Sequence, residues 1–142
     1  DLDNTTTIVL TGKNDNLYKS ISKLALENVV PLKYTNQVAS LMAQSDLLIS
    51  KAGGITLFEA IASELPFIVY KPELGQEIEN AKFIYQESIG NIALNIEELK
   101  LIITDLINNK KKIEEYKTRI VKLKKNINIK VLAEESIRLL SN

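Results

Sequence analysis

Short apolar runs alternate with segments of helical periodicity, and this alternation constrains the fold of the chain more than any other feature. Runs of β-branched and apolar residues occupy positions 5–11, 29–32, 47–50, 67–70 and 91–94. Between them, apolar residues recur every three or four positions, which is the period of an amphipathic helix. Buried strands that are separated by helices favour a parallel sheet, because parallel neighbours need a crossover connection. We therefore expect an α/β fold with a Rossmann-like parallel sheet flanked by helices.

The apolar spacing also predicts where the helices lie. It indicates a helix after each of the first four strands, and the fourth helix covers about residues 76–86. Glycine and polar residues at 12–14 end the first strand in a loop. From residue 96 onward only helical spacing remains, including a last run that contains Leu132 and Leu140. We expect residues 1–142 to form one domain with residues 96–142 as its C-terminal helices.

The composition excludes several kinds of chemistry. The 142 residues include no His and no Cys, and 18 basic residues balance 18 acidic ones. A chain without these residues has no His general base, no thiol nucleophile and no Cys/His zinc site. A net charge of zero argues against the positive field of a dedicated nucleic-acid binder. No apolar stretch approaches the roughly 18–20 residues of a membrane span. We expect a soluble, cytoplasmic chain that binds more than it catalyses and is a fragment of a longer protein, because it begins with Asp1 rather than Met.

The stretch 50–60 joins an expected strand end to a helix start through Gly53 and Gly54. In parallel sheets, ligands lie beyond the carboxyl ends of the strands, where helix N-termini converge. Two positions without side chains let a diphosphate approach free N–H groups at the positive end of the helix dipole. The Thr56 hydroxyl could add a donor, and Glu59 could accept hydrogen bonds from ribose hydroxyls. The alternative is a tight turn followed by a solvated glutamate.

The stretch 70–81 also joins a strand end to a helix start. Gln76 and Glu77 offer an amide and a carboxylate to sugar hydroxyls, and Asn80 lies one turn further on. The alternative is helix capping, because a glutamate in the first turn stabilises the helix dipole by about 0.3–1 kcal/mol. Taken alone, this second stretch fits capping better.

Together, the stretches 50–66 and 75–81 resemble the donor-binding half of glycosyltransferase family 28. The resemblance covers roughly residues 5–100 in order and spacing. Lys-Ala-Gly-Gly at 51–54 and Gly-Gln-Glu at 75–77 are most similar to the bacterial processive diacylglycerol glucosyltransferases of that family, which also contains the monogalactosyldiacylglycerol synthases.

This resemblance implies the C-terminal half of a two-domain, GT-B type, inverting glycosyltransferase, truncated at its N-terminal side. It implies that the full protein transfers glucose from UDP-glucose, or a related UDP-sugar, to diacylglycerol in glycolipid synthesis. The acceptor domain with its catalytic base is absent, so the chain itself holds no catalytic residue and needs no metal or other cofactor. The full protein is expected to be peripheral at the inner face of the membrane, with a lipid acceptor and no nucleic acid as partner. Two alternatives stay open: transfer of N-acetylglucosamine to a lipid-linked peptidoglycan precursor, and a non-enzymatic α/β nucleotide-binding module.

The resemblance also implies roles for single residues of the two stretches. Glu59 matches the acidic residue that binds the ribose hydroxyls. The diphosphate-facing turn matches Gly53, Gly54 and Thr56. Gln76 and Glu77 match the pair that binds the donor sugar, and Asn80 lies nearby.

Further matches and two departures lie outside the central motifs. Tyr34 and Thr35 match the position after a strand that contacts the uracil, and Gly12 and Lys13 match a loop of the cleft. Glu64 stands where the family usually has Gly, and a left-handed Glu at a helix end costs roughly 1 kcal/mol. Leu74 replaces a Pro that often precedes Gly-Gln-Glu, which loosens the loop facing the sugar.

The zero net charge conceals two charged regions. Residues 110–125 carry eight basic against two acidic residues, whereas 73–98 carry six Glu against one Lys. The basic region predicts either a solvated helix face or a helix that docks on an anionic membrane surface. Charge runs usually solvate helices, which favours the first interpretation.

Overall fold

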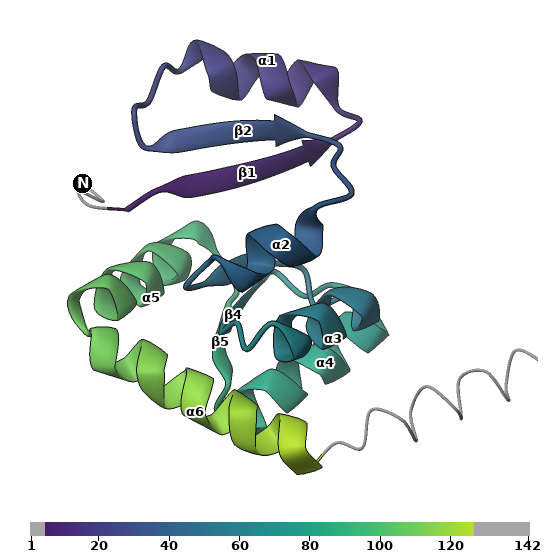
Figure 1. The fold of residues 1–142 in the computed structure, drawn as a ribbon, viewed down its shortest axis with the longest axis vertical. Coiled ribbons are helices and arrows are strands. Elements are labelled where there is room, and N and C mark those ends of the chain that lie inside the picture. The colour runs from purple at the N-terminus through teal and green to yellow at the C-terminus, as the bar shows by residue number, and fades with distance from the viewer. Residues whose placement is uncertain (1–4, 127–142) are drawn as a thin grey trace, which may run out of the picture. The chain divides into compact units, whose positions relative to one another are not determined.

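Strands and helices alternate along the chain in a computed structural model, which describes residues 5–126 (Figure 1). The chain divides into two compact units, residues 1–38 and residues 39–142. Among the described residues, no helix is both long enough and apolar enough to cross a membrane.

The first unit is a β-α-β element. Strands β1 (Thr7–Gly12) and β2 (Val29–Lys33) pair in parallel, and α1 (Asp15–Lys23) connects them. The Asn14 side chain starts the helix, because its oxygen accepts a hydrogen bond of 2.9 Å from the N–H of Leu17. The helix supplies the crossover that two parallel strands need.

The second unit contains a parallel three-stranded sheet with helices around it. Its strands are β3 (Leu48–Ser50), β4 (Phe67–Tyr70) and β5 (Gly90–Ala93), in the order β3-β4-β5. Its helices are α2 (Val38–Ala43), which begins at the last residue of the first unit, α3 (Gly54–Ala62), α4 (Gly75–Gln86), α5 (Ile96–Asn108) and α6 (Lys110–Asn126). Because β4 is the central strand and both its faces are covered, its four residues form one continuous apolar run.

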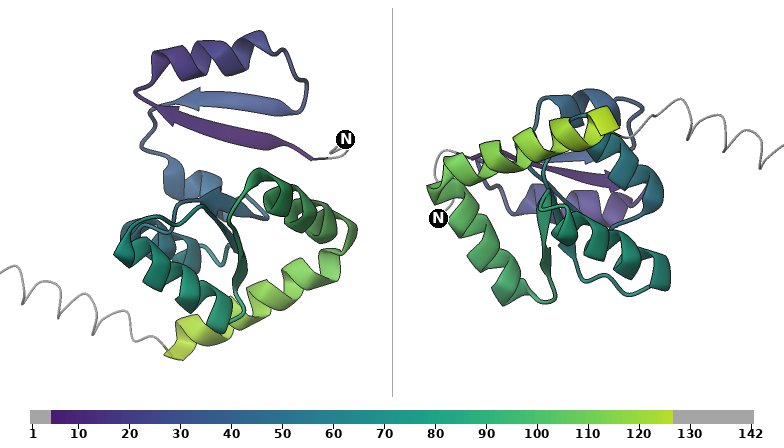
Figure 2. Two further views of the ribbon diagram at one scale, coloured as in Figure 1. Left: turned by 180° about the vertical axis from the view of Figure 1, so that it is seen from behind. Right: turned by 90° about the horizontal axis from the view of Figure 1, so that it is seen from below.

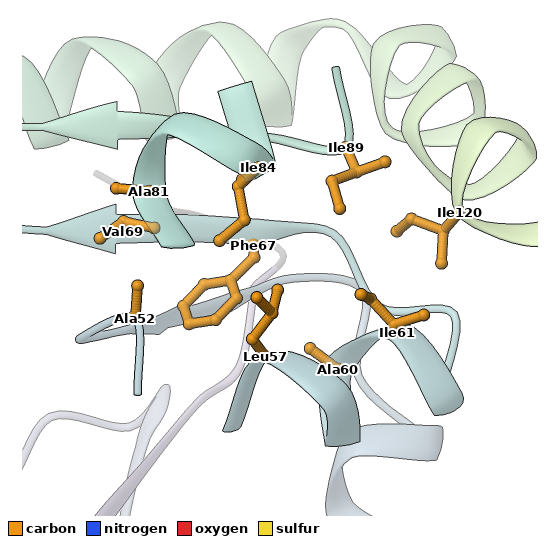
Figure 3. Packing of buried hydrophobic residues seen from close by; sticks show 10 residues of the cluster. All are labelled: Ala52, Leu57, Ala60, Ile61, Phe67, Val69, Ala81, Ile84, Ile89 and Ile120. Carbon is orange, nitrogen blue, oxygen red and sulfur yellow. The ribbon is translucent and has the colours of Figure 1, made fainter. Parts of the chain in front are cut away.

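Side chains of β4 alternate between two apolar clusters, as the pleat of a strand requires. Phe67 and Val69 pack with α3, α4 and Ile120 of α6 (Figure 3). Ile68 belongs to the other cluster, with α5 and Tyr116 of α6. Helix α6 therefore contributes to both clusters, and it crosses the end of the second unit (Figure 2, right).

These elements confirm the predicted α/β fold of parallel strands flanked by helices. In the described residues the strands form two parallel sheets, β1-β2 and β3-β4-β5, with one in each unit. Four of the predicted strands differ from the observed ones by one or two residues at an end, since the expected runs 5–11, 29–32, 47–50 and 91–94 became Thr7–Gly12, Val29–Lys33, Leu48–Ser50 and Gly90–Ala93. The largest correction is at β1, which extends through Gly12, a residue that the sequence placed in the following loop. A φ of +58° lets Gly12 end the strand in a left-handed conformation. The predicted helical run with Leu132 and Leu140 lies outside the described residues.

Candidate functional site

The two sequence stretches singled out above lie side by side in the second unit. The loop between β3 and α3 is linked to α4 by Asn80, whose side-chain nitrogen donates a hydrogen bond of 2.7 Å to the carbonyl oxygen of Ala52. A Cβ atom added to Gly54 would lie 3.9 Å from the side-chain nitrogen of Gln76. Residues from two loops at the carboxyl ends of adjacent strands therefore form one site, as parallel sheets favour.

The N-terminus of α3 presents free backbone donors. Gly53 is its N-cap residue and provides no side-chain hydrogen bond to the first turn. The first N–H groups of any helix lack partners within the helix, so those of Gly54, Ile55 and Thr56 are available to an anion. The Thr56 hydroxyl lies close by, since an added Cβ at Gly53 would be 3.9 Å from its oxygen.

Neither glycine of this turn is needed by the protein itself. Gly53 has φ −64° and ψ 144°, which other residues adopt, and a Cβ at Gly53 or Gly54 would make only ordinary contacts. Gly90 is different, because its Cβ would clash with the carbonyl oxygen of Phe67. The open space at Gly53 and Gly54 argues against the tight-turn alternative and favours a ligand that approaches the backbone.

Glu59 lies one turn beyond Thr56, so the two residues share a face of α3. Its side chain is half-buried, and the structure records no hydrogen bond or ion pair for its carboxylate within residues 5–126. The carboxylate is therefore available to a ligand's hydroxyl groups.

Glu77 already has a structural role at the start of α4. One of its carboxylate oxygens accepts a hydrogen bond of 3.1 Å from the N–H of Glu73. This bond lowers the pKa of Glu77 from its ordinary value, and the N–H of Leu74 and the charge of Lys51 act in the same direction. Glu77 thus caps the helix and shapes the loop, whereas the neighbouring Gln76 is exposed. The role of either residue toward a sugar stays a prediction.

Glu73 borders the candidate site, and the sequence did not indicate it. Its carboxylate oxygen lies 3.3 Å from the Lys51 ammonium, so the pair joins the two loops. Both side chains are more than half exposed, and such pairs contribute little stability by themselves. The two residues are 22 positions apart, and no local periodicity could have paired them.

The remaining predicted contacts belong to the first unit. Lys13 and Tyr34 are exposed, and Tyr34 is the more conspicuous because 71% of its surface is accessible. The Thr35 hydroxyl accepts a hydrogen bond of 3.1 Å from the N–H of Gln37. Gly12 and Lys13 lie at the end of β1, and Tyr34 and Thr35 follow the end of β2. The role of these residues in nucleotide binding stays a prediction.

Family and sequence comparisons agree on one group of proteins. The model of the Glycosyltransferase family 28 C-terminal domain matches residues 2–137. The processive diacylglycerol beta-glucosyltransferase of Staphylococcus carnosus (strain TM300) is 38% identical over 101 residues, which are 70% of this chain and 26% of the relative. The enzyme of the same name from Bacillus subtilis (strain 168) is 34% identical over 134 residues, which are 92% of this chain and 35% of the relative. The chain spans about a quarter to a third of these relatives.

Solved structures of glycosyltransferases have a similar fold. The glycotransferase of kitacinnamycin matches with a TM-score of 0.55 and 13% identity, over 83% of this chain and 40% of that one. The glycosyltransferase SnogD from Streptomyces nogalater matches with a TM-score of 0.51 and 18% identity, over 84% of this chain and 38% of that one. At such low identity the likeness shows the fold alone.

Proposed function

Because this chain belongs to the glycosyltransferase family 28 C-terminal domain family, we propose that it is the UDP-sugar binding part of an inverting glycosyltransferase. The reaction proposed for the longer protein is transfer of glucose from UDP-glucose to diacylglycerol. Support for the acceptor comes from the relatives, which are named processive diacylglycerol beta-glucosyltransferases at 29–38% identity.

The observation that carries the proposal is the open turn at Gly53 and Gly54 beside Gln76. A diphosphate bound there would accept hydrogen bonds from the first-turn N–H groups of α3, at the positive end of the helix dipole. The Thr56 hydroxyl would add a further donor. The Gln76 amide would bind a sugar attached to that diphosphate, because its nitrogen would lie 3.9 Å from a Cβ at Gly54.

Glu59 would fix the nucleoside by accepting hydrogen bonds from its ribose hydroxyls. The carboxylate stands free of protein partners among the described residues and lies on the same face of α3 as Thr56. A charged acceptor of this kind binds hydroxyl donors more strongly than a neutral one.

The chain contributes to the chemistry mainly by stabilising the leaving group. When the acceptor hydroxyl attacks the sugar, negative charge develops on the departing diphosphate. Fixed N–H groups at the start of α3 would stabilise that charge. The Lys51 ammonium would stabilise it further, because its loop borders the same turn. The base that removes the acceptor proton is proposed to lie outside this chain, which has no His.

Calorimetric titration with UDP, UDP-glucose, UDP-N-acetylglucosamine and ADP tests the proposal. We expect the chain to bind UDP and UDP-glucose at about 1 mM ligand or below, and ADP more weakly. Tighter binding of UDP-N-acetylglucosamine than of UDP-glucose would favour the peptidoglycan precursor as acceptor instead. Absence of binding by every uridine nucleotide would contradict the proposal. Transfer of labelled glucose to diacylglycerol by a longer protein that contains this chain tests the acceptor.

A further inference from the structure

Helix α6 holds several elements of the second unit through its polar side chains. Lys112 pairs with Asp105 of α5 at 2.7 Å, and Lys117 pairs with Asp46, which precedes β3, at 3.2 Å. The Tyr116 hydroxyl accepts a hydrogen bond of 2.8 Å from the Asn91 side chain of β5. Some cations of the basic region therefore bind other parts of the protein, instead of forming a solvated or lipid-binding face.

Lys124 of α6 binds the C-terminal end of α3. Its ammonium donates hydrogen bonds of 2.8 Å to the carbonyl oxygen of Ala62 and 3.0 Å to the carboxylate of Glu64. The last carbonyl groups of a helix lack partners within the helix, and a cation there also complements the helix dipole. Glu64 has φ +57°, so the left-handed conformation that the sequence suggested is present, and its carboxylate binds Lys124.

Arg119 of α6 binds the end of α4 in a similar way. Its guanidinium donates a hydrogen bond of 3.2 Å to the carbonyl oxygen of Ser88, which follows the helix with φ +53°. Between these two basic residues, Ile120 is buried in the cluster that α3 and α4 share with Phe67, and Leu123 packs against that cluster. Residues 119–124 of α6, about one and a half turns, thus contact the C-terminal ends of both helices.

We propose that Arg119 and Lys124 are positioning residues for the donor site, because they hold the C-terminal ends of the two helices whose N-termini form it. The inference rests on the proposed function. Helix α3 has nine residues and is rigid over that length, so its first residue, Gly54, lies about 12 Å from Ala62. At the site, α3 and α4 are joined by the bond from Asn80 to Ala52 and the exposed pair of Lys51 and Glu73. Ties at both ends fix the spacing between Gly54 and Gln76.

Substitution by Met tests the proposal, because Met keeps an apolar stem and removes the donors. The test variant is Arg119→Met/Lys124→Met, and the rescue variant is Arg119→Lys/Lys124→Arg, which keeps a cation at each position. Lys122→Met is the matched control, since Lys122 is exposed on the same helix and has no recorded contact among the described residues. The single variant Arg119→Met replaces the double variant if the latter does not unfold cooperatively in urea.

Two measurements are made on each folded variant. Calorimetry gives the dissociation constants of UDP and UDP-glucose, and NMR gives the signals of the Gly54 backbone amide and the Gln76 side-chain amide. We expect both amide signals to shift in the test variant. We also expect its affinity for UDP-glucose to fall about threefold or more relative to its affinity for UDP, a size typical of coupling through packed elements. The rescue and control variants should keep the wild-type ratio and signals.

A purely structural role predicts something else. It would lower the resistance to urea while leaving the ratio and both amide signals unchanged, and that result would overturn the proposal. If the unmodified chain binds neither nucleotide, the proposed function fails. The amide signals of the test variant then still decide whether α6 positions the two helix N-termini.

Discussion

The side-chain nitrogen of Asn80 lies 2.7 Å from the carbonyl oxygen of Ala52 and donates a hydrogen bond to it. Ala52 is fully buried, so Asn80 satisfies an acceptor that water does not reach easily. This bond joins the helix of one sequence stretch to the loop of the other. Asn80 therefore acts as a link within the site, whereas the sequence suggested only that it lies near a sugar.

Replacing Asn80 by Ala should destabilise the second unit. The buried carbonyl would lose its partner, which costs about 1–3 kcal/mol. Urea unfolding measures the change, and Gln86→Ala serves as the control because Gln86 is exposed on the same helix. Asn80→Asp should be at least as destabilising, since a carboxylate cannot donate to a carbonyl. Equal stability of Asn80→Ala and the control would contradict the role of Asn80 as a link.

Replacing Gly54 by Ala should separate binding from stability. A Cβ there makes only ordinary contacts with the protein, so the free energy of unfolding should stay equal or rise by up to about 1 kcal/mol. UDP affinity, measured by calorimetry, should fall because the methyl group occupies space that a diphosphate needs. Gly90→Ala should instead lower the free energy of unfolding by about 1–3 kcal/mol, because the added Cβ would clash with Phe67. Undiminished UDP affinity in Gly54→Ala would remove the turn from the site.

Replacing Glu59 by Ala should weaken UDP binding. The lost hydrogen bonds to a charged acceptor correspond to about 1–3 kcal/mol. Calorimetry measures the affinity, and thermal unfolding checks that the fold is intact. Glu97→Ala is the control, because Glu97 is exposed on another helix. If both variants bind UDP equally well, Glu59 does not contact the nucleoside.

Acidification should release the loop that Glu77 holds. The backbone N–H of Glu73 keeps the pKa of Glu77 below its ordinary value of 4.5 in the folded state. The carboxylate therefore stabilises the fold above pH 4.5, and this contribution is lost as the pH falls through the lowered pKa. Glu77→Gln should be less stable than the wild type at pH 7, and the difference should shrink at acid pH. Urea unfolding across this range measures it, and a constant difference would contradict the cap.

The basic region should bind anionic vesicles weakly. Four of its cations contact protein groups, and they are Lys112, Lys117, Arg119 and Lys124. Glu114 and Glu115 are exposed on the same helix, and Glu114 also pairs with Lys117 at 3.5 Å. Their negative charges reduce the attraction of the helix to anionic lipid. Sedimentation with anionic vesicles at physiological salt should leave the chain in solution. Salt-dependent sedimentation that is lost in Lys122→Met/Lys125→Met would support membrane docking instead.

Local patterns were sufficient to predict most of the helices and strands and to select the two stretches that form the candidate site. The run 67–70 became β4 with the predicted bounds, because a central strand of a parallel sheet is apolar on both faces. The glycine pair between a strand and a helix was also visible locally, but it fitted a tight turn as well, and only the resemblance of the stretches 50–66 and 75–81 together favoured a diphosphate turn. The left-handed conformation of Glu64 fits the resemblance instead, because the family usually has Gly at this helix end.

Contacts between distant residues were not predictable in this way. Lys51 and Glu73 are 22 residues apart, and Lys124 and Glu64 are 60 apart. Their pairing depends on how helices pack against the sheet, which no local period records. The sequence also could not distinguish a capping Glu77 from a sugar ligand, because both roles place a carboxylate in the first turn of a helix.

By itself, then, the sequence determined the order of strands and helices, the absence of His and Cys chemistry, and the two stretches that carry the family resemblance. These features depend on residue type and on periods of two to four residues, so they are legible without a fold. Only the tertiary structure decided that Gly53 and Gly54 are free of packing demands, that Asn80 links the two stretches, and that four cations of the basic helix α6 contact other parts of the protein at its surface. Such properties depend on which surfaces meet in space, and packing rather than local preference selects them.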